Sequence, residues 1–182
     1  MRLFFAIELP DPLREHLVSV QKRLEPAVRM AYTRPENLHL TLKFLGEVAD
    51  GVVASVCAAA AALPKRDFLE LQAGGLVCFP EQGKVRIAGA VVTAGPALSN
   101  LVADLEDAGE RLGFERERRA FVPHITLARA RVPLASAVRA KLAEAAAGSF
   151  PGPKATVGQY VLMESDLSRG GATYRTVARF DL

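Results

Sequence analysis

Two stretches of the sequence carry a histidine and a threonine at the same spacing. The first reads NLHLTLKFLG at positions 37–46, and the second reads VPHITLAR at positions 122–129. Polar and apolar residues alternate in both, which is typical of a half-buried β-strand whose polar side chains share one face. His39, Thr41 and Lys43 are therefore expected on one face of the first strand. His124 and Thr126 are expected on one face of the second.

A pair of imidazoles can cleave or form a phosphodiester by proton transfer. A neutral histidine accepts a proton from water while a protonated one supplies a proton to the leaving oxygen. The ordinary pKa of histidine, near 6.5, makes both forms accessible at neutral pH. Each threonine hydroxyl can donate to a non-bridging phosphoryl oxygen. Lys43 is predicted to add a positive charge at the rim of the site, whereas His16, beside an apolar helical stripe, is expected to be structural.

The composition describes a globular, mildly basic chain. Of its 182 residues half are hydrophobic, and 23 Lys and Arg against 20 Asp and Glu give a net charge of +3. This charge is compatible with binding phosphate or RNA, but it is far from that of a polybasic nucleic-acid coat. Cys57 and Cys78 form no metal or redox motif, which favours free buried thiols and a cytoplasmic location. We expect neither a signal peptide nor a membrane span, because no apolar run is long enough.

The spacing of apolar residues and breakers divides the rest of the chain into elements. Strands are predicted at 3–9, 37–46, 68–73, 76–79, 84–93, 122–129, 155–164 and 173–180, and helices at 12–26, 51–63, 95–112 and 133–148. Residues 165–171 are expected to be a polar loop between the last two strands. The charged connector 114–120 is expected to be a solvated loop, or alternatively a basic loop that grasps substrate.

The order of these elements repeats. His39 and His124 stand 85 residues apart, and each motif strand precedes a helix that is followed by paired strands. Such a repeat indicates an ancient duplication. We predict one α+β domain spanning residues 1–182, with two lobes related by a pseudo-two-fold axis. Two antiparallel sheets would face a central cleft, with the helices outside.

The motifs resemble those of a known family. Residues 36–46 and 121–129 are similar to the two histidine motifs of the 2H phosphoesterase superfamily, in particular of the RNA 2′,3′-cyclic phosphodiesterases once called 2′-5′ RNA ligases. Residues 2–7 resemble the opening strand of that family. Glu164-Ser165, Gly170-Gly171 and Tyr174 resemble its closing hairpin, so the resemblance runs from end to end.

This resemblance implies an activity and roles for single residues. It implies metal-independent hydrolysis of a 2′,3′-cyclic phosphate at an RNA or nucleotide end, without a cofactor, leaving a 2′-phosphomonoester. His39 would be the proton donor to the departing 3′ oxygen and His124 the proton acceptor from water. The residues themselves leave these roles interchangeable, because the two halves are nearly symmetric and 2′-5′ ligation would reverse them.

The chain departs from the family pattern in one strand. Many relatives carry an aromatic residue after the glycine turn, but residues 85–91 hold none, and the chain has no tryptophan. Base stacking from that strand is thus in doubt. Phe5 (or its neighbour Phe4) and Tyr174 are the candidates for contact with a base. In a regular strand Arg129 lies on the face opposite to that of Thr126, so it contacts the substrate only if the strand ends or bulges there.

Several alternatives remain open. The chain could be a non-catalytic module that binds RNA ends, or a phosphodiesterase for 2′-5′ oligonucleotides or small cyclic nucleotides. Neither histidine stands beside a nucleophile in a recognisable elbow, and two histidines without a third ligand give little basis for a metal site. We expect a monomer, because no apolar stripe is left over once the core is assigned.

Overall fold

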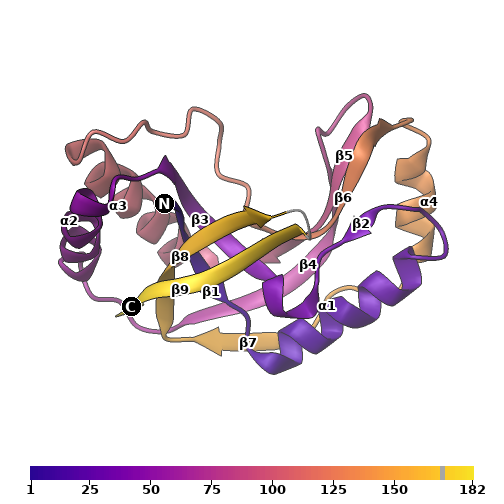
Figure 1. Ribbon diagram of the computed structural model, residues 1–182. Helices are drawn as coiled ribbons and strands as arrows, with labels where there is room; N and C mark the ends of the chain where they lie inside the picture. The colour runs from indigo at the N-terminus through magenta and orange to yellow at the C-terminus, as the bar shows by residue number, and fades with distance from the viewer. Residues whose placement is uncertain (169–170) are drawn as a thin grey trace.

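The computed structural model describes residues 1–168 and 171–182, in which four α-helices pack against one nine-stranded sheet (Figure 1). The α+β class predicted from the sequence is confirmed. The elements are β1 (Arg2–Glu8), α1 (Asp11–Leu24), β2 (Ala31–Tyr32), a 3₁₀ turn (Pro35–Asn37), β3 (His39–Glu47), α2 (Asp50–Ala61), β4 (Leu69–Phe79), β5 (Val85–Thr93), α3 (Gly95–Arg111), β6 (His124–Leu134), α4 (Val138–Ala145), β7 (Lys154–Val157), β8 (Gln159–Ser168) and β9 (Gly171–Asp181).

The last hairpin is longer than the sequence predicts. The strand pairing of β8 and β9 continues to Ser168 and Gly171, so most of the expected loop 165–171 is strand. Arg169 and Gly170, part of the motif compared with the family's closing hairpin, lie outside the described residues.

The sheet is antiparallel and falls into two half-sheets. The strand order is β7-β4-β5-β6-β3-β1-β8-β9, and β2 adds a short pairing to β6. The halves β7-β4-β5-β6 and β3-β1-β8-β9 meet at β3 and β6, where the register consists of the single pair Leu40 and Ile125. The two predicted sheets are thus joined edge to edge through the two histidine strands.

Each half-sheet is covered by helices that come from both halves of the sequence. In Figure 1, α2 and α3 lie together on one side of the molecule, and α1 and α4 lie on the other. Helix α3 contacts β3, and α2 contacts β9, whereas α1 contacts β6, β7 and α4. The helix that precedes each histidine motif therefore packs behind the strand that carries the other histidine.

Helix α1 shows why the sequence folds this way locally. Pro12 stands in its first turn, a position where the missing N–H costs no hydrogen bond. Leu13, Leu17, Val20 and Leu24 recur at helical spacing and are all fully buried. Burying each of these side chains contributes about 1.5–3 kcal/mol, which fixes the helix on the sheet.

Both histidine strands contain a β-bulge directly after the His-x-Thr sequence. In β3 the register against β1 shifts between Thr41 and Lys43, and in β6 the register against β5 shifts between Thr126 and Ala128. Each strand consequently buries two successive residues, Leu42 and Lys43 in β3 and the pair 127–128 in β6. The alternation of faces is reversed beyond both bulges.

Cys57 and Cys78 are free thiols, as the sequence predicts, but both are only partly buried rather than buried. Among the described residues, no helix is both long and apolar enough to cross a membrane.

Candidate active site

The two motif histidines are held by the same hydrogen bond. The Nδ1 atom of His39 lies 2.7 Å from the Asn37 carbonyl oxygen, and Nδ1 of His124 lies 2.7 Å from the Val122 carbonyl oxygen. A carbonyl oxygen only accepts, so each Nδ1 carries the proton and donates it. This bond fixes the tautomer of each neutral ring and leaves Nε2 as the atom free to exchange a proton.

The strand register brings the two motifs together about the pseudo-two-fold axis. Leu40 and Ile125, the pair that joins the half-sheets, are both fully buried on the helix-covered face. Their neighbours His39, Thr41, His124 and Thr126 point to the opposite face, and all four are half-buried. In this register each histidine stands opposite the threonine of the other motif.

The surroundings of His39 disfavour its charged form. Burial lowers the pKa of His39, the hydrogen bond to the Asn37 carbonyl opposes this, and the charges of Arg129 and His124 lower the pKa further. Nε2 of His39 lies 3.0 Å from the Thr41 hydroxyl oxygen. When the ring is neutral, the hydroxyl donates this bond; when it is protonated, the ring donates.

Arg129 reaches the site because β6 bulges. The sequence placed Arg129 on the wrong face unless the strand bulged, and the bulge at Leu127 and Ala128 is present. Arg129 is exposed, and its charge acts on His39. The equivalent bulge in β3 places Phe44, 60% exposed, at the matching position of the other motif. The sequence analysis missed Phe44, because regular alternation places it on the apolar face of the strand.

The prediction that Lys43 lies at the rim of the site is wrong. The bulge in β3 turns Lys43 to the helix-covered face, where its side chain is 1% exposed. Its Nζ donates to Glu106 Oε2 at 2.5 Å and to the Glu115 carbonyl oxygen at 3.1 Å. Strict alternation places Lys43 on the same face as Thr41. The extra residue of the bulge turns Lys43 to the opposite face.

Of the aromatic candidates, the structure separates Phe5 from Tyr174. Phe5 is 4% exposed and packs in the core against Tyr160 and Phe180, so the prediction that it contacts a base is wrong. Its neighbour Phe4 points to the histidine face. The rings of Phe4 and Tyr174 lie 5.1 and 5.0 Å from the His39 ring, centroid to centroid.

His124 also has an aromatic neighbour, which comes from a strand in which the sequence analysis named no site residue. The ring of Phe79, the last residue of β4, lies 4.6 Å from the His124 ring. Residues 85–91 lack an aromatic, as noted from the sequence, and the paired strand supplies one instead. The signal in the sequence was weak, because Phe79 ends an apolar run like any core residue.

A groove of about 560 Å³ opens beside His39. Of the four motif side chains only His39 lines it, together with residues from β1, β8, β9 and the start of α1. Val161, Met163 and Tyr174 give it apolar surface. Arg14, Arg179, Glu8 and Glu36 give it charges of both signs. The groove therefore suits a flat, partly polar group better than a free anion.

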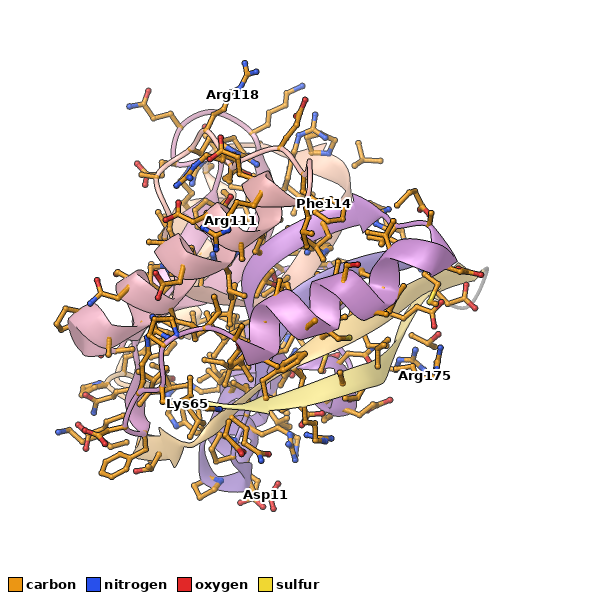
Figure 2. The ribbon with its side chains drawn as sticks, turned by 90° about the vertical axis from the view of Figure 1, so that its left-hand side faces the viewer. Asp11, Lys65, Arg111, Phe114, Arg118 and Arg175 are labelled. Carbon is orange, nitrogen blue, oxygen red and sulfur yellow. The ribbon has the colours of Figure 1, made fainter. Side chains whose placement is uncertain are left out.

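The charged connector before β6 is exposed along residues 115–120. Arg116 binds Asp107 and Glu110 of α3, and Arg119 binds Glu117 within the connector. Figure 2 shows Arg118 at the outer edge of the molecule, pointing away from it. These positions favour the solvated loop over the substrate-grasping one.

The remaining groups lie apart from this site. His16 sits on α1 with its ring 6.0 Å from that of Phe150, which agrees with the structural role expected for it. In the described ranges, 1–168 and 171–182, no three His, Cys, Asp or Glu side chains gather as metal ligands do. Whether the reaction needs a metal is a separate question, and its independence of metal stays a prediction.

Known proteins share both the sequence and the fold. Residues 7–88 and 91–174 match the LigT-like phosphoesterase family. A Thermus thermophilus protein named RNA 2′,3′-cyclic phosphodiesterase is 31% identical, over all of this chain and 90% of its own length. The crystal structure of TT0787 of Thermus thermophilus is 27% identical and has a TM-score of 0.83, covering 100% of this chain and 98% of that one.

The crystal structure of Escherichia coli LigT complexed with 3′-AMP superposes with a TM-score of 0.78. It is 26% identical and covers 100% of this chain and 97% of that one. The match to the family extends across both histidine strands and β8, and it ends at Tyr174 in β9. This chain belongs to the LigT-like phosphoesterase family.

Proposed function

We propose that this chain hydrolyses the 2′,3′-cyclic phosphate at the end of an RNA or a nucleotide and leaves a 2′-phosphomonoester. The observation that carries the proposal is the pair of imidazoles that share one face of the sheet, each with Nδ1 bonded to a backbone carbonyl, so that Nε2 is the atom that exchanges a proton. In His39 that atom also contacts the Thr41 hydroxyl. The family and the names of the relatives support this class of reaction.

In the proposed reaction the two imidazoles act as general base and general acid. His124 Nε2 takes a proton from water, and the water oxygen forms a bond to phosphorus. The bond between phosphorus and the 3′ oxygen breaks. His39 gives its Nε2 proton to that oxygen, so one proton is taken and one is given in each turnover.

The other polar groups on this face hold the charge of the phosphate. In the proposed complex the hydroxyls of Thr41 and Thr126 would donate to its two non-bridging oxygens, and Arg129 would supply a positive charge. Thr41 would exchange its contact with a neutral His39 for this one, or accept from the ring once His39 is protonated. The anion of the substrate also offsets the charge of Arg129 beside His39. We therefore infer that substrate binding raises the pKa of His39, so that the ring carries the proton that it must donate.

The groove beside His39 fits the nucleoside part of the substrate. Its volume of about 560 Å³ is within the range of small-molecule sites, roughly 300–1,000 Å³. Tyr174 lines the groove where it reaches His39, and a base can stack on its ring there. Phe4 is only 2% exposed and packs against the rings of both Tyr174 and His39.

If the 5′ hydroxyl group of another RNA took the place of water, the same arrangement would join it to the 2′,3′-cyclic phosphate through a 2′-5′ linkage. His124 would accept the proton of that hydroxyl, and His39 would still donate to the departing 3′ oxygen. The exchange of roles expected from the sequence therefore does not follow, because only cyclisation, the reverse reaction, exchanges them. Ligation, like the monomeric state and the cytoplasmic location, remains a prediction made from the sequence.

The first experiment is the hydrolysis of a nucleoside 2′,3′-cyclic monophosphate and of a short RNA ending in a cyclic phosphate, with a chelator present. Phosphorus NMR identifies the product. We expect a 2′-phosphomonoester in spite of the chelator. A 3′-phosphate would contradict the proposed regiochemistry. Tight binding of RNA ends without turnover would favour the non-catalytic module, and turnover of 2′-5′ linked dinucleotides alone would favour the other phosphodiesterase.

The two-imidazole mechanism predicts that His39→Ala and His124→Ala each abolish turnover while the circular dichroism spectrum is unchanged. Each variant removes one of the two proton-transfer groups, whose individual contributions are typically about 10²–10⁴-fold. His16→Gln is the matched control and should keep wild-type activity. Wild-type turnover in either alanine variant would refute the mechanism.

A further inference from the structure

Two buried polar contacts lie behind the histidine strands at equivalent places in the two halves. Gln21 of α1 and Glu106 of α3 stand 85 residues apart, the same distance that separates the two motif histidines. Both are buried, with 6% and 9% of their surface exposed. A buried polar side chain is retained only where it makes hydrogen bonds, so we asked what each one holds.

Gln21 links the connector that enters the first motif to the strand of the second. Its Nε2 donates to the carbonyl oxygens of Thr33 and Leu127, both at 2.8 Å. Thr33 stands four residues before Asn37, whose carbonyl oxygen orients His39. Leu127 lies in the bulge of β6, three residues after His124. One amide group therefore fixes the approach to one histidine against the strand of the other.

Glu106 makes the equivalent link in the other half. Its Oε2 accepts from Lys43 Nζ at 2.5 Å and from the Glu117 N–H at 3.2 Å. Glu117 stands five residues before Val122, whose carbonyl oxygen orients His124. Lys43 lies in the bulge of β3 and also donates to the Glu115 carbonyl oxygen. Again the connector entering one motif is tied to the bulge of the opposite strand.

The two links differ in chemistry because the two connectors differ in structure. Ahead of β3, the chain forms β2 and pairs with Ala128 and Arg129 through its backbone, so an amide suffices. Ahead of β6, the equivalent residues form no strand, and the long side chain of Lys43 reaches them instead. Gly109 makes room for it, since a Cβ there would lie 2.5 Å from Lys43 Cε.

These links matter because little else joins the histidine strands. The register between β3 and β6 consists of one residue pair, and both strands bulge immediately beyond it. We propose that Gln21 and the Lys43–Glu106 pair are positioning residues that set the relative placement of His39 and His124. The proposal rests on the proposed function, in which one proton must be taken and another given across the same phosphate.

The test removes each link without leaving a buried charge unpaired. The variants are Gln21→Leu and the double substitution Lys43→Met with Glu106→Leu. Glu106→Gln is the variant that keeps the hydrogen bonds of the link, because its amide oxygen still accepts from Lys43 and Glu117, although the Lys43 ammonium then lacks its carboxylate partner. Glu70→Gln is the matched control, since it breaks an exposed ion pair with Lys154 and takes part in neither link. Circular dichroism checks that each variant folds.

We expect kcat for a nucleoside 2′,3′-cyclic monophosphate to fall about ten- to a hundredfold in Gln21→Leu and in the double variant, with KM changed by less than about threefold. Misplacing the reacting groups by about 1 Å lowers the rate by a factor of this order. Glu106→Gln should recover most of the loss, and Glu70→Gln should match the wild type. A double variant that is folded and has wild-type kcat would overturn the proposal. If it fails to fold, wild-type kcat in Gln21→Leu would do the same.

A second readout does not depend on turnover. In protein labelled with ¹⁵N-histidine, the nitrogen shifts report which ring nitrogen carries the proton. We expect the Nδ1–H tautomer for His39 and His124 in the wild type and a mixture of tautomers in the variants. Unchanged shifts would contradict the proposal even if the wild type proved inactive. Inactive wild type with altered shifts in the variants would instead contradict the proposed function alone.

Discussion

At the scale of single residues, the site is defined by what holds each histidine. The ring nitrogen Nδ1 is occupied by the carbonyl group two residues earlier in the chain, in both motifs. This bond spans only two residues, so its partners follow from a short stretch of sequence, whereas the placement of each carbonyl group depends on the connector that leads into the strand. The more distant influences, such as Arg129 on His39, depend on the folded sheet.

The threonines provide a prediction at this scale. Thr41→Val and Thr126→Val keep the shape of the side chain but remove the hydroxyl donor to the phosphate. We expect kcat to fall on the order of tens- to hundreds-fold, as for the loss of one oxyanion donor, with little change in KM. Steady-state kinetics on a cyclic nucleotide measures this. A rise in KM at constant kcat would mean that the hydroxyls bind the ground state only.

Arg129 provides a second prediction at the scale of single residues. Its positive charge is one cause of the lowered pKa of His39, so Arg129→Gln should raise that pKa. Titration of the imidazole Cε1–H signals by NMR gives the value directly, because the chain has only three histidines. Arg131→Gln, two residues further along β6, is the control. An unchanged pKa in Arg129→Gln would show that Arg129 points away from the site.

At the scale of elements, the two bulges decide which side chains reach the site. Regular alternation predicts the faces of His39, Thr41, His124 and Thr126 correctly, because all four precede the bulges. It fails for Lys43, and it would have failed for Arg129. A bulge leaves no mark in the apolar pattern when both residues of the bulge are tolerated in the core, as Lys43 is through its ion pair.

The fold, like the site, was predictable only in part, and for similar reasons. Apolar periodicity and breakers located the helices and most strands. The exchange of helices between the half-sheets was not predictable, because α1 and α3 present equivalent apolar stripes to either sheet. Phe5 shows the same limit: adjacent aromatic residues in a strand face opposite sides, and the sequence does not say which side is the core.

The packing of α3 on β3 predicts the effect of one methyl group. A Cβ on Gly109 would lie 2.5 Å from Lys43 Cε, while Lys43 is held by Glu106. Gly109→Ala should therefore lower stability by about 1–3 kcal/mol, although alanine favours helix formation. Gly51→Ala is the matched control in α2, where a Cβ meets no atom within 4 Å. It should leave stability unchanged or raise it, and urea unfolding of both proteins measures the difference.

At the scale of the whole molecule, the histidines make stability depend on pH. Burial lowers the pKa of His39 and of His16 in the folded protein. The unfolded chain, with an ordinary pKa near 6.5, then binds more protons than the folded one below neutral pH. Stability should be complete above about pH 6.5 and fall as the pH drops below it.

Thermal unfolding at pH 7.5, 6.5 and 5.5 measures this dependence. We expect the melting temperature to decrease along the series and to decrease less in His39→Gln, which has no imidazole to protonate at that position. A melting temperature that rises from pH 7.5 to 5.5 would show that the folded protein takes up the protons instead.

The interleaving of the two half-sheets has a consequence for how the protein is made. The half-sheet of β3 needs β8 and β9, which are synthesised last, and the ring of Tyr174 on β9 packs against His39. A nascent chain that ends before β8 already contains both histidines. It still lacks the two strands that complete the half-sheet of β3 and the Tyr174 ring that packs against His39. We expect ribosome-bound chains that stop before β8 to be inactive, so that activity begins only after the last hairpin has left the ribosome.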